Sequence, residues 1–114
     1  MRKDDIIRVR HMLDSAGEAL SFAKGKSRGD LETDRMLALS IVKSIEIVGE
    51  AAAGVSAEFR KLYPDIPWQD IVAMRNRLVH VYFDIDLDRV WDTLLEDLPK
   101  LTADLERVIA SSTE

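Results

Sequence analysis

The sequence has 114 residues, the length of a single domain, and 46% of them are apolar, which is enough for a modest hydrophobic core. It contains no cysteine, so disulfides and thiolate metal sites are excluded. The formal net charge of −5 and the pI of about 5.0 argue against a protein that coats nucleic acid non-specifically, because such binding depends on many lysine and arginine contacts to phosphates. They permit an enzyme that holds a short RNA at one basic site.

The N-terminal half of the chain predicts two helices joined by a loop. Apolar residues recur every three or four positions over residues 6–20, which is the spacing of one helix face. Two glycines and a serine interrupt this pattern within residues 24–30, which are therefore expected to form a loop. The helical pattern resumes at about Asp30 and continues to Ala52, and Gly54 behind it suits a C-terminal stop.

Two more helices are predicted in the middle of the chain. The first is short and covers residues 56–64, with Ser56 as its N-cap and Pro64 as its terminator. The second is longer and covers residues 66–82, with Pro67 in its first turn. No apolar run reaches membrane-spanning length and no targeting segment is recognisable, so we expect a cytoplasmic protein without a membrane partner.

A last helix is predicted by apolar residues spread over 87–108, and Pro99 should kink or split it. Three aspartates within residues 84–88 resemble a calcium loop, but Arg89 and Leu95 stand where an EF-hand requires glycine and glutamate, so we assign the aspartates to capping. No stretch alternates with period two. The sequence therefore predicts an all-α bundle of four main helices and a short connector helix.

The most reactive side chains of the chain gather at its predicted fourth helix. Asn76 and His80 are four residues apart and would share a helix face, and the long side chain of Arg75 could reach the same place. A histidine can take the proton of a ribose 2′-hydroxyl, and an arginine can stabilise charge on a scissile phosphate, so this set suits metal-independent RNA cleavage. Tyr82 adds a phenolic hydroxyl. The alternative is a capped and solvated helix end whose arginines pair with nearby aspartates.

Two carboxylates on the second helix are candidates for a supporting role. Glu46 and Glu50 lie four residues apart on an otherwise apolar helix, where the glycine between them allows a close helix crossing. Because a buried carboxylate needs a partner, we expect one of them to pair with Arg75 or Arg77 and to set its orientation. The alternative is an ordinary structural ion pair without a role in catalysis.

The segment "RNRLVHVY" matches the R-x4-H-x-Y signature of the HepT-like toxins, a branch of the HEPN superfamily. Residues 33–52 resemble the second-helix segment of that family, and residues 63–99 resemble its central block. The resemblance implies one HEPN-type domain over residues 1–114 that forms a homodimer and acts as an endoribonuclease toxin without a metal or cofactor. The partner it implies is an MNT-type nucleotidyltransferase antitoxin, which transfers AMP from ATP to the motif tyrosine.

Carried over by position, the resemblance makes Arg75 and His80 catalytic, Asn76 a supporting residue and Tyr82 the AMP acceptor. Relatives frequently have glycine before the tyrosine, whereas this chain has the stiffer Val81. A second hypothesis is a catalytically silent HEPN domain that binds a nucleotide or a nucleotidyltransferase, and a third is a plain dimeric scaffold. The intact motif favours the enzyme, with RNA and not DNA as its substrate.

Overall fold

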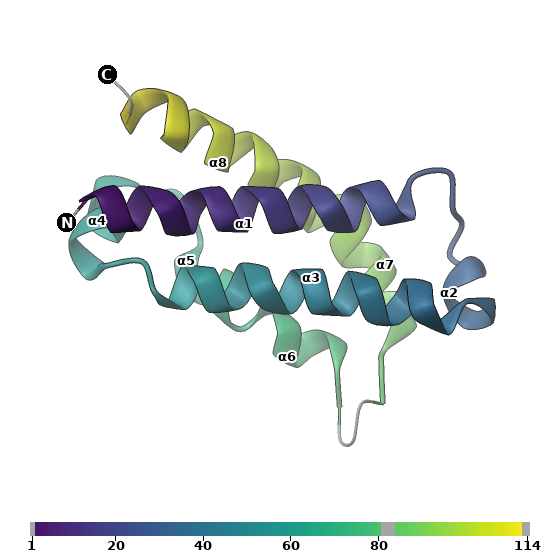
Figure 1. Cartoon of the computed structure of the whole chain (residues 1–114). Helices are drawn as coiled ribbons and strands as arrows, with labels where there is room; N and C mark the ends of the chain where they lie inside the picture. The colour runs from purple at the N-terminus through teal and green to yellow at the C-terminus, as the bar shows by residue number, and fades with distance from the viewer. Residues whose placement is uncertain (1, 81–83, 113–114) are drawn as a thin grey trace.

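The computed structural model describes residues 2–80 and 84–112, and residues 1, 81–83 and 113–114 lie outside the described part. The described residues are mostly helical and contain no β-strand beyond one isolated bridge, which confirms the predicted all-α class (Figure 1). The elements in chain order are α1 (Arg2–Ala23), α2 (Asp30–Thr33), α3 (Arg35–Ala53), α4 (Ala57–Leu62), α5 (Trp68–Val72), α6 (Met74–Leu78), α7 (Leu87–Asp92), the π-helix η2 (Thr93–Asp97) and α8 (Leu98–Ser112).

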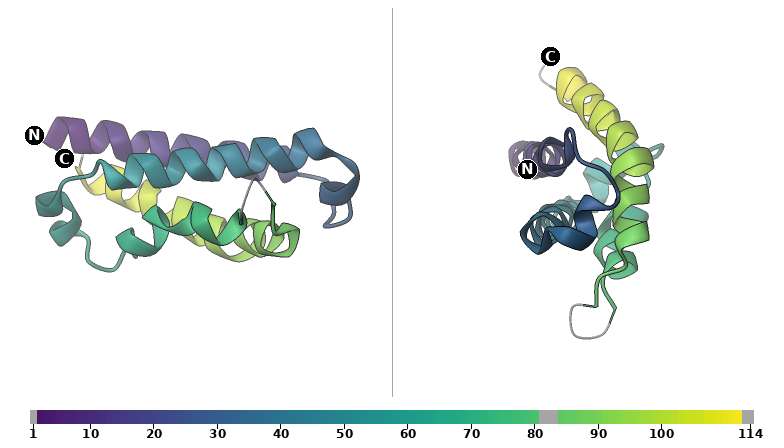
Figure 2. Two further views of the ribbon diagram at one scale, coloured as in Figure 1. Left: turned by 90° about the horizontal axis from the view of Figure 1, so that it is seen from below. Right: turned by 90° about the vertical axis from the view of Figure 1, so that its right-hand side faces the viewer.

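The helices form two layers. α1 and α3 run antiparallel side by side, and the continuous C-terminal segment of α7, η2 and α8 crosses both of them from the other side (Figure 1, Figure 2). The short helices α5 and α6 pack on α3. Fully buried side chains from both layers meet in one hydrophobic cluster, which includes Met12, Ile41, Ile45, Leu98 and Leu105.

The predicted first helix and loop are confirmed. Val9 and Ala16 of the predicted apolar face are fully buried in α1, and the apolar residues at positions 6, 13 and 20 pack at its edge. Residues 24–29 form the predicted loop, in which Gly25 has a φ of 76°. This left-handed conformation favours glycine because it has no Cβ. No helix in the described part of the chain is long and apolar enough to cross a bilayer.

The predicted second helix is interrupted near its start. Asp34 adopts an extended conformation with φ −121° and ψ 92°, so the short α2 is separate from α3. The Asp34 carboxylate accepts a hydrogen bond of 3.0 Å from the Leu37 amide and caps α3. Periodicity missed this break because an aspartate side chain offers the backbone an alternative to the helical hydrogen bond. α3 then ends before Gly54, as predicted.

The predicted short helix is confirmed as α4, with Ser56 as its N-cap. The Ser56 hydroxyl accepts a hydrogen bond of 3.1 Å from the Phe59 amide. Asp5 of α1, which is only 3% exposed, accepts hydrogen bonds from the Ser56 amide at 2.8 Å and from its hydroxyl at 2.7 Å. This buried carboxylate therefore ties the start of α4 to α1, which keeps its charge hydrogen-bonded.

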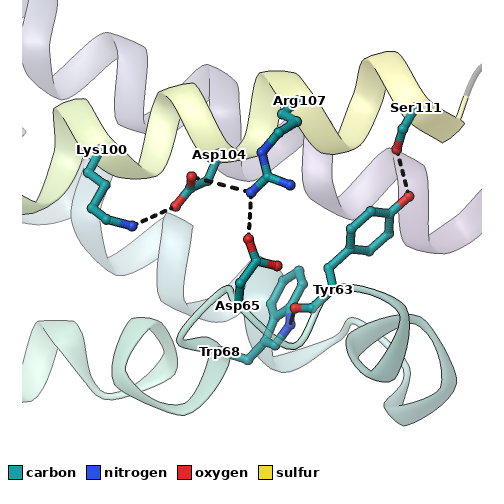
Figure 3. Close-up of polar contacts among 7 residues, drawn as sticks. All are labelled: Tyr63, Asp65, Trp68, Lys100, Asp104, Arg107 and Ser111. Carbon is teal, nitrogen blue, oxygen red and sulfur yellow. Dashed lines mark hydrogen bonds and ion pairs between the residues drawn. The ribbon is translucent and has the colours of Figure 1, made fainter.

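Polar contacts also tie the segment after α4 to the last helix. The Tyr63 hydroxyl lies 2.9 Å from the Ser111 hydroxyl, and Arg107 donates a hydrogen bond of 2.8 Å to Asp65 (Figure 3). The Trp68 indole N–H, which belongs to a buried ring, donates to the Tyr63 carbonyl at 3.1 Å. These contacts fix the chain where it enters α5.

The helix predicted over residues 66–82 is wrong in its length. Pro67 lies before α5 and not within its first turn, Ala73 separates α5 from α6, and α6 ends at Leu78. Gly49 explains how α5 packs here, because a Cβ at that position would lie 3.2 Å from the Val72 carbonyl oxygen. The close crossing of α3 that the glycine predicted is therefore present.

After Leu78 the chain is extended and not helical. Val79 has φ −125° and ψ 125° and forms an antiparallel bridge with Ile85, while the Asp86 amide donates a hydrogen bond of 2.7 Å to the Leu78 carbonyl. Val79 is 6% exposed, so its side chain is buried in this conformation. The prediction that Asn76 and His80 share a helix face is consequently wrong.

The last helix is irregular just before Pro99 but continuous through it, so the predicted disturbance is present and the chain is not split there. The π-helical turns of η2 lie immediately before α8, in which proline occupies the second position and lacks the N–H of a regular helical hydrogen bond. The assignment of the preceding aspartates to capping is confirmed for Asp86, whose carboxylate accepts a hydrogen bond of 3.1 Å from the Arg89 amide.

Candidate functional site

The centre of the candidate site is an ion pair between α6 and α3. The Arg75 Nε donates a hydrogen bond of 3.1 Å to Glu46 Oε2, and the two side chains are 34% and 29% exposed. The predicted pairing of a glutamate on this helix with an arginine of the motif is confirmed for these two residues. No other described residue accepts a hydrogen bond from the Arg75 side chain, which is partly exposed, so its terminal Nη atoms keep their donors for a ligand.

Glu46 is shared with a second cation. The Lys43 Nζ lies 3.0 Å from Glu46 Oε1, so one carboxylate oxygen binds the lysine and the other binds Arg75. The pKa of Glu46 is lowered, first by the Lys43 hydrogen bond and then by the charges of Lys43 and Arg75, while burial acts against them. The pKa of Lys43 is raised by the same hydrogen bond. With all three groups ionised, the cluster carries a net charge of about +1.

The other two supporting residues do not join this cluster. Glu50 is exposed, and no described arginine pairs with it. Arg77 is also exposed, and its Nη2 donates a hydrogen bond of 2.8 Å to the Asp70 carbonyl of α5 instead of to a carboxylate. Arg77 therefore ties α6 to α5.

Asn76 lies beside Arg75 on the exposed side of α6. Its backbone N–H donates to the Ala73 carbonyl at 3.0 Å, and its side-chain amide makes no hydrogen bond within the described residues. The amide is therefore free to donate to or accept from a ligand.

His80 lies beyond α6, on the first arm of the loop that leads to α7. Its amide donates a hydrogen bond of 2.8 Å to the Asp84 carbonyl on the opposite arm, and its Nδ1 lies 4.0 Å from the Asp84 carboxylate. The His80 side chain is 57% exposed. Both arms project from the bundle below α3, as Figure 1 and the right-hand view of Figure 2 show. Tyr82, the expected AMP acceptor, and Val81 lie outside the described residues.

Sequence reasoning missed two residues at this site. Lys43 precedes Glu46 by three residues on α3, a spacing that favours an ion pair and could have identified it. Asp84 was assigned to capping, and the extended arms bring it beside His80 instead. Within the described residues, no three His, Asp or Glu side chains gather as metal ligands would.

The family model and the relatives that match this chain all carry ribonuclease names. The model of the family described as "Ribonuclease HepT-like" matches residues 12–108. A Methanocaldococcus jannaschii protein named "Gamma-glutamylcyclotransferase and putative RNase" is 35% identical over 96% of this chain, which spans 49% of that protein.

Two relatives of similar size match as well. One, a "Putative RNase" of the same organism, is 33% identical over 85% of this chain and 89% of its own length. The other, a "Probable ribonuclease HepT" of Thermococcus cleftensis, is 34% identical over 69% of this chain and 72% of its own length. No solved structure matches at a comparable level of significance.

Proposed function

The chain belongs to the HepT-like ribonuclease family, and from that premise we propose that it is a metal-independent endoribonuclease in which Arg75 and His80 act on the RNA backbone. The observation that carries this proposal is the Arg75 guanidinium, which Glu46 orients through Nε while its Nη atoms keep their donors for a ligand. Two free N–H donors in a planar fork suit the non-bridging oxygens of a phosphate. The exposed imidazole of His80 provides a ring nitrogen that can accept or donate a proton.

In the proposed reaction, neutral His80 accepts the proton of a ribose 2′-hydroxyl while the 2′-oxygen attacks the adjacent phosphorus. The bond from phosphorus to the 5′-oxygen of the next nucleotide breaks, and one fragment ends in a 2′,3′-cyclic phosphate. A second proton donor protonates the 5′-oxygen, so the other fragment begins with a 5′-hydroxyl. Arg75 stabilises the charge that grows on the phosphate oxygens, and Asn76 supports it with a hydrogen bond from its amide.

We propose that the second proton donor is His80 of a second copy in a homodimer. The exposed side of α3 that bears Glu46 also carries Met36, which is 80% exposed, and Leu39, which is 40% exposed. Val72 at the end of α5 is 37% exposed, and its carbonyl lies beside Gly49 of α3. Burying this apolar surface in a two-fold interface would remove it from water and bring two motifs together.

We further propose that the chain is the toxin of a type II toxin–antitoxin system whose antitoxin is an MNT-type nucleotidyltransferase. The antitoxin would transfer AMP from ATP to the Tyr82 hydroxyl, forming an O–P bond and releasing pyrophosphate and the phenolic proton. In the sequence, Tyr82 lies two residues after His80 and two residues before Asp84. A bulky anion there would occupy the space beside the histidine and repel the RNA phosphate.

Expression without the antitoxin tests the ribonuclease. The wild type should arrest growth and leave RNA fragments with 2′,3′-cyclic phosphate ends, whereas His80→Ala and Arg75→Ala should do neither. His11→Ala and Arg107→Ala are matched controls, since His11 is the only other histidine and Arg107 pairs with Asp104 of its own helix and with Asp65 before α5. Equal growth of all variants, with purified and folded wild type unable to cut RNA, would contradict the proposal and leave a binding module.

The two tyrosines of the chain allow a sharp test of the modification site. Incubation with the antitoxin and ATP should add the mass of AMP to the wild type and to Tyr63→Phe, and should add nothing to Tyr82→Phe. Tyr63 is a suitable control because its hydroxyl already contacts Ser111 in the folded protein. AMP on Tyr82→Phe would place the modification elsewhere.

A further inference from the structure

A groove of about 420 Å³ lies between the end of α1 and the C-terminal helical segment, outside the Arg75 and His80 site. Its volume falls within the range of roughly 300–1,000 Å³ that is typical of small-molecule sites. Its walls are apolar, and two lysines of the loop 24–29 complete its lining. The lining residues used below are Leu20, Lys24, Lys26, Trp91, Leu94 and Leu95.

Trp91 differs from the other tryptophan in its surroundings. Trp68 is 6% exposed and its indole N–H donates to the Tyr63 carbonyl, so it belongs to the core. Trp91 is only partly buried, and its indole makes no hydrogen bond within the described residues. An aromatic surface at the wall of an open groove, with a free N–H, can stack on a nucleobase.

The groove is basic at its rim although the chain as a whole is acidic. Lys24 and Lys26 line the groove and are exposed, and neither lies within salt-bridge distance of a carboxylate in the described residues, although the charges of Lys26 and Asp30 interact. Arg28 of the same loop is instead paired with Glu32 and with Asp88. Two exposed lysines without a salt bridge, beside an aromatic and aliphatic wall, are complementary to a phosphate and its base.

The groove is connected to the catalytic loop by α7. The 2.8 Å ion pair between Arg28 and Asp88 fixes the basic loop to the first turn of α7. That helix begins directly after the arm that carries Asp84, the residue beside His80, and it carries Trp91 one turn further on. α7 therefore links the catalytic loop to the groove along the chain.

We propose that this groove is a second RNA subsite, which binds a nucleotide of single-stranded RNA away from the scissile bond. The base would stack on Trp91 between Leu20 and Leu95, and Lys24 and Lys26 would bind the flanking phosphates. The proposal rests on the proposed ribonuclease function for its substrate. It assigns the groove to substrate affinity and not to the chemical step.

The first test is charge reversal of the rim. Lys24→Glu combined with Lys26→Glu should raise KM for a single-stranded RNA about tenfold and leave kcat within about twofold, since each lysine contributes binding only. The slope of log K for RNA binding against log salt concentration should also become shallower, by the equivalent of about one to two phosphate contacts. Lys3→Glu with Lys61→Glu makes the same charge change on α1 and α4 at the other end of the molecule and should alter KM much less (Figure 1).

The second test follows tryptophan fluorescence, to which Trp91 contributes from the groove wall and Trp68 from the core. In a His80→Ala background, which should not cut its ligand, titration with an oligouridylate of about eight nucleotides should quench tryptophan fluorescence with saturation. Leu95→Glu, at a side chain that is already 60% exposed, places a negative charge in the groove without opening the core and should abolish the quenching. The fluorescence of Trp68, which is buried in the core, reports whether the variant retains its fold.

The outcomes separate this inference from the proposed ribonuclease. Cleavage by the wild type with unchanged KM in the lysine variant and no quenching would overturn the subsite and leave the ribonuclease intact. Quenching that depends on Lys24, Lys26 and Leu95 without any cleavage would support the subsite and refute the enzyme. Loss of self-association in Leu95→Glu, with RNA binding unaffected, would make the groove a protein interface and overturn the subsite.

Discussion

Replacing Glu46 with glutamine tests whether this carboxylate orients Arg75 for the reaction. The change keeps an oxygen that can accept from the Arg75 Nε, but it removes the charge that both Lys43 and Arg75 contact at 3.0 and 3.1 Å. The three side chains are 29%, 34% and 65% exposed, so solvent screens much of their attraction. We therefore expect a loss of only about 0.5–1 kcal/mol in the free energy of unfolding, typical of exposed ion pairs.

The expected effect on catalysis is larger than the effect on stability. If Glu46 orients Arg75, Glu46→Gln should lower kcat about tenfold, equivalent to about 1.4 kcal/mol of transition-state stabilisation. KM should stay constant or fall, because removing a negative charge beside the phosphate site favours RNA binding. Steady-state cleavage of one RNA substrate at several concentrations separates the two parameters.

Asp104→Asn is the matched control for this experiment. Asp104 is also a carboxylate shared by a lysine and an arginine, at 3.2 Å from Lys100 and 3.4 Å from Arg107, and it does not contact Arg75 (Figure 3). Its replacement should lower stability by a similar amount and leave kcat unchanged. A wild-type kcat in stable Glu46→Gln, or an equal loss in both variants, would refute the orienting role.

The remaining predictions concern stability and are measured by chemical denaturation. The pKa of Glu46 is lower in the folded than in the unfolded chain, so its contribution to the unfolding free energy is complete above the ordinary pKa of 4.5 and is lost as the pH falls through the lower folded pKa. The difference in unfolding free energy between wild type and Glu46→Gln should therefore close over that pH range. A difference that stays constant would argue against the ion pair. Asp5→Ala should cost about 2 kcal/mol, because it removes two hydrogen bonds from a buried charge to Ser56, whereas Asp4→Ala on the exposed side should cost little. Gly49→Ala should destabilise by about 1 kcal/mol net, since the clash with the α5 carbonyls outweighs the gain in helix propensity; greater stability would show that α5 can move away.

The interior of the bundle was largely predictable from the sequence. The spacing of apolar residues placed α1 and most of α3, because a helix that packs on one side must repeat its buried positions every three to four residues. Local hydrogen-bonding chemistry identified the cap of α4 at Ser56, and the missing N–H of Pro99 indicated the irregular turns in the last helix. The pair of Glu46 and Arg75 followed from the cost of an unpartnered carboxylate on an apolar helix.

Local pattern was insufficient where distant contacts determine the backbone. The residues around Val79 read as a continuing helix, but pairing with Ile85 and burial of the valine side chain favour an extended arm. This difference moves His80 from a helix face to a loop arm, where its Nδ1 lies 4.0 Å from the Asp84 carboxylate.

The sequence by itself determined which side chains are available for chemistry, since the motif from Arg75 to His80 and its family are features of the chain. Only the tertiary structure decided how they are presented. It gave Arg75 a carboxylate from another helix, and it separated the two tryptophans into a core residue, Trp68, and a groove residue, Trp91. The physical reason is that helical periodicity reports which face is buried, whereas the partner across that face depends on how helices distant in sequence pack together.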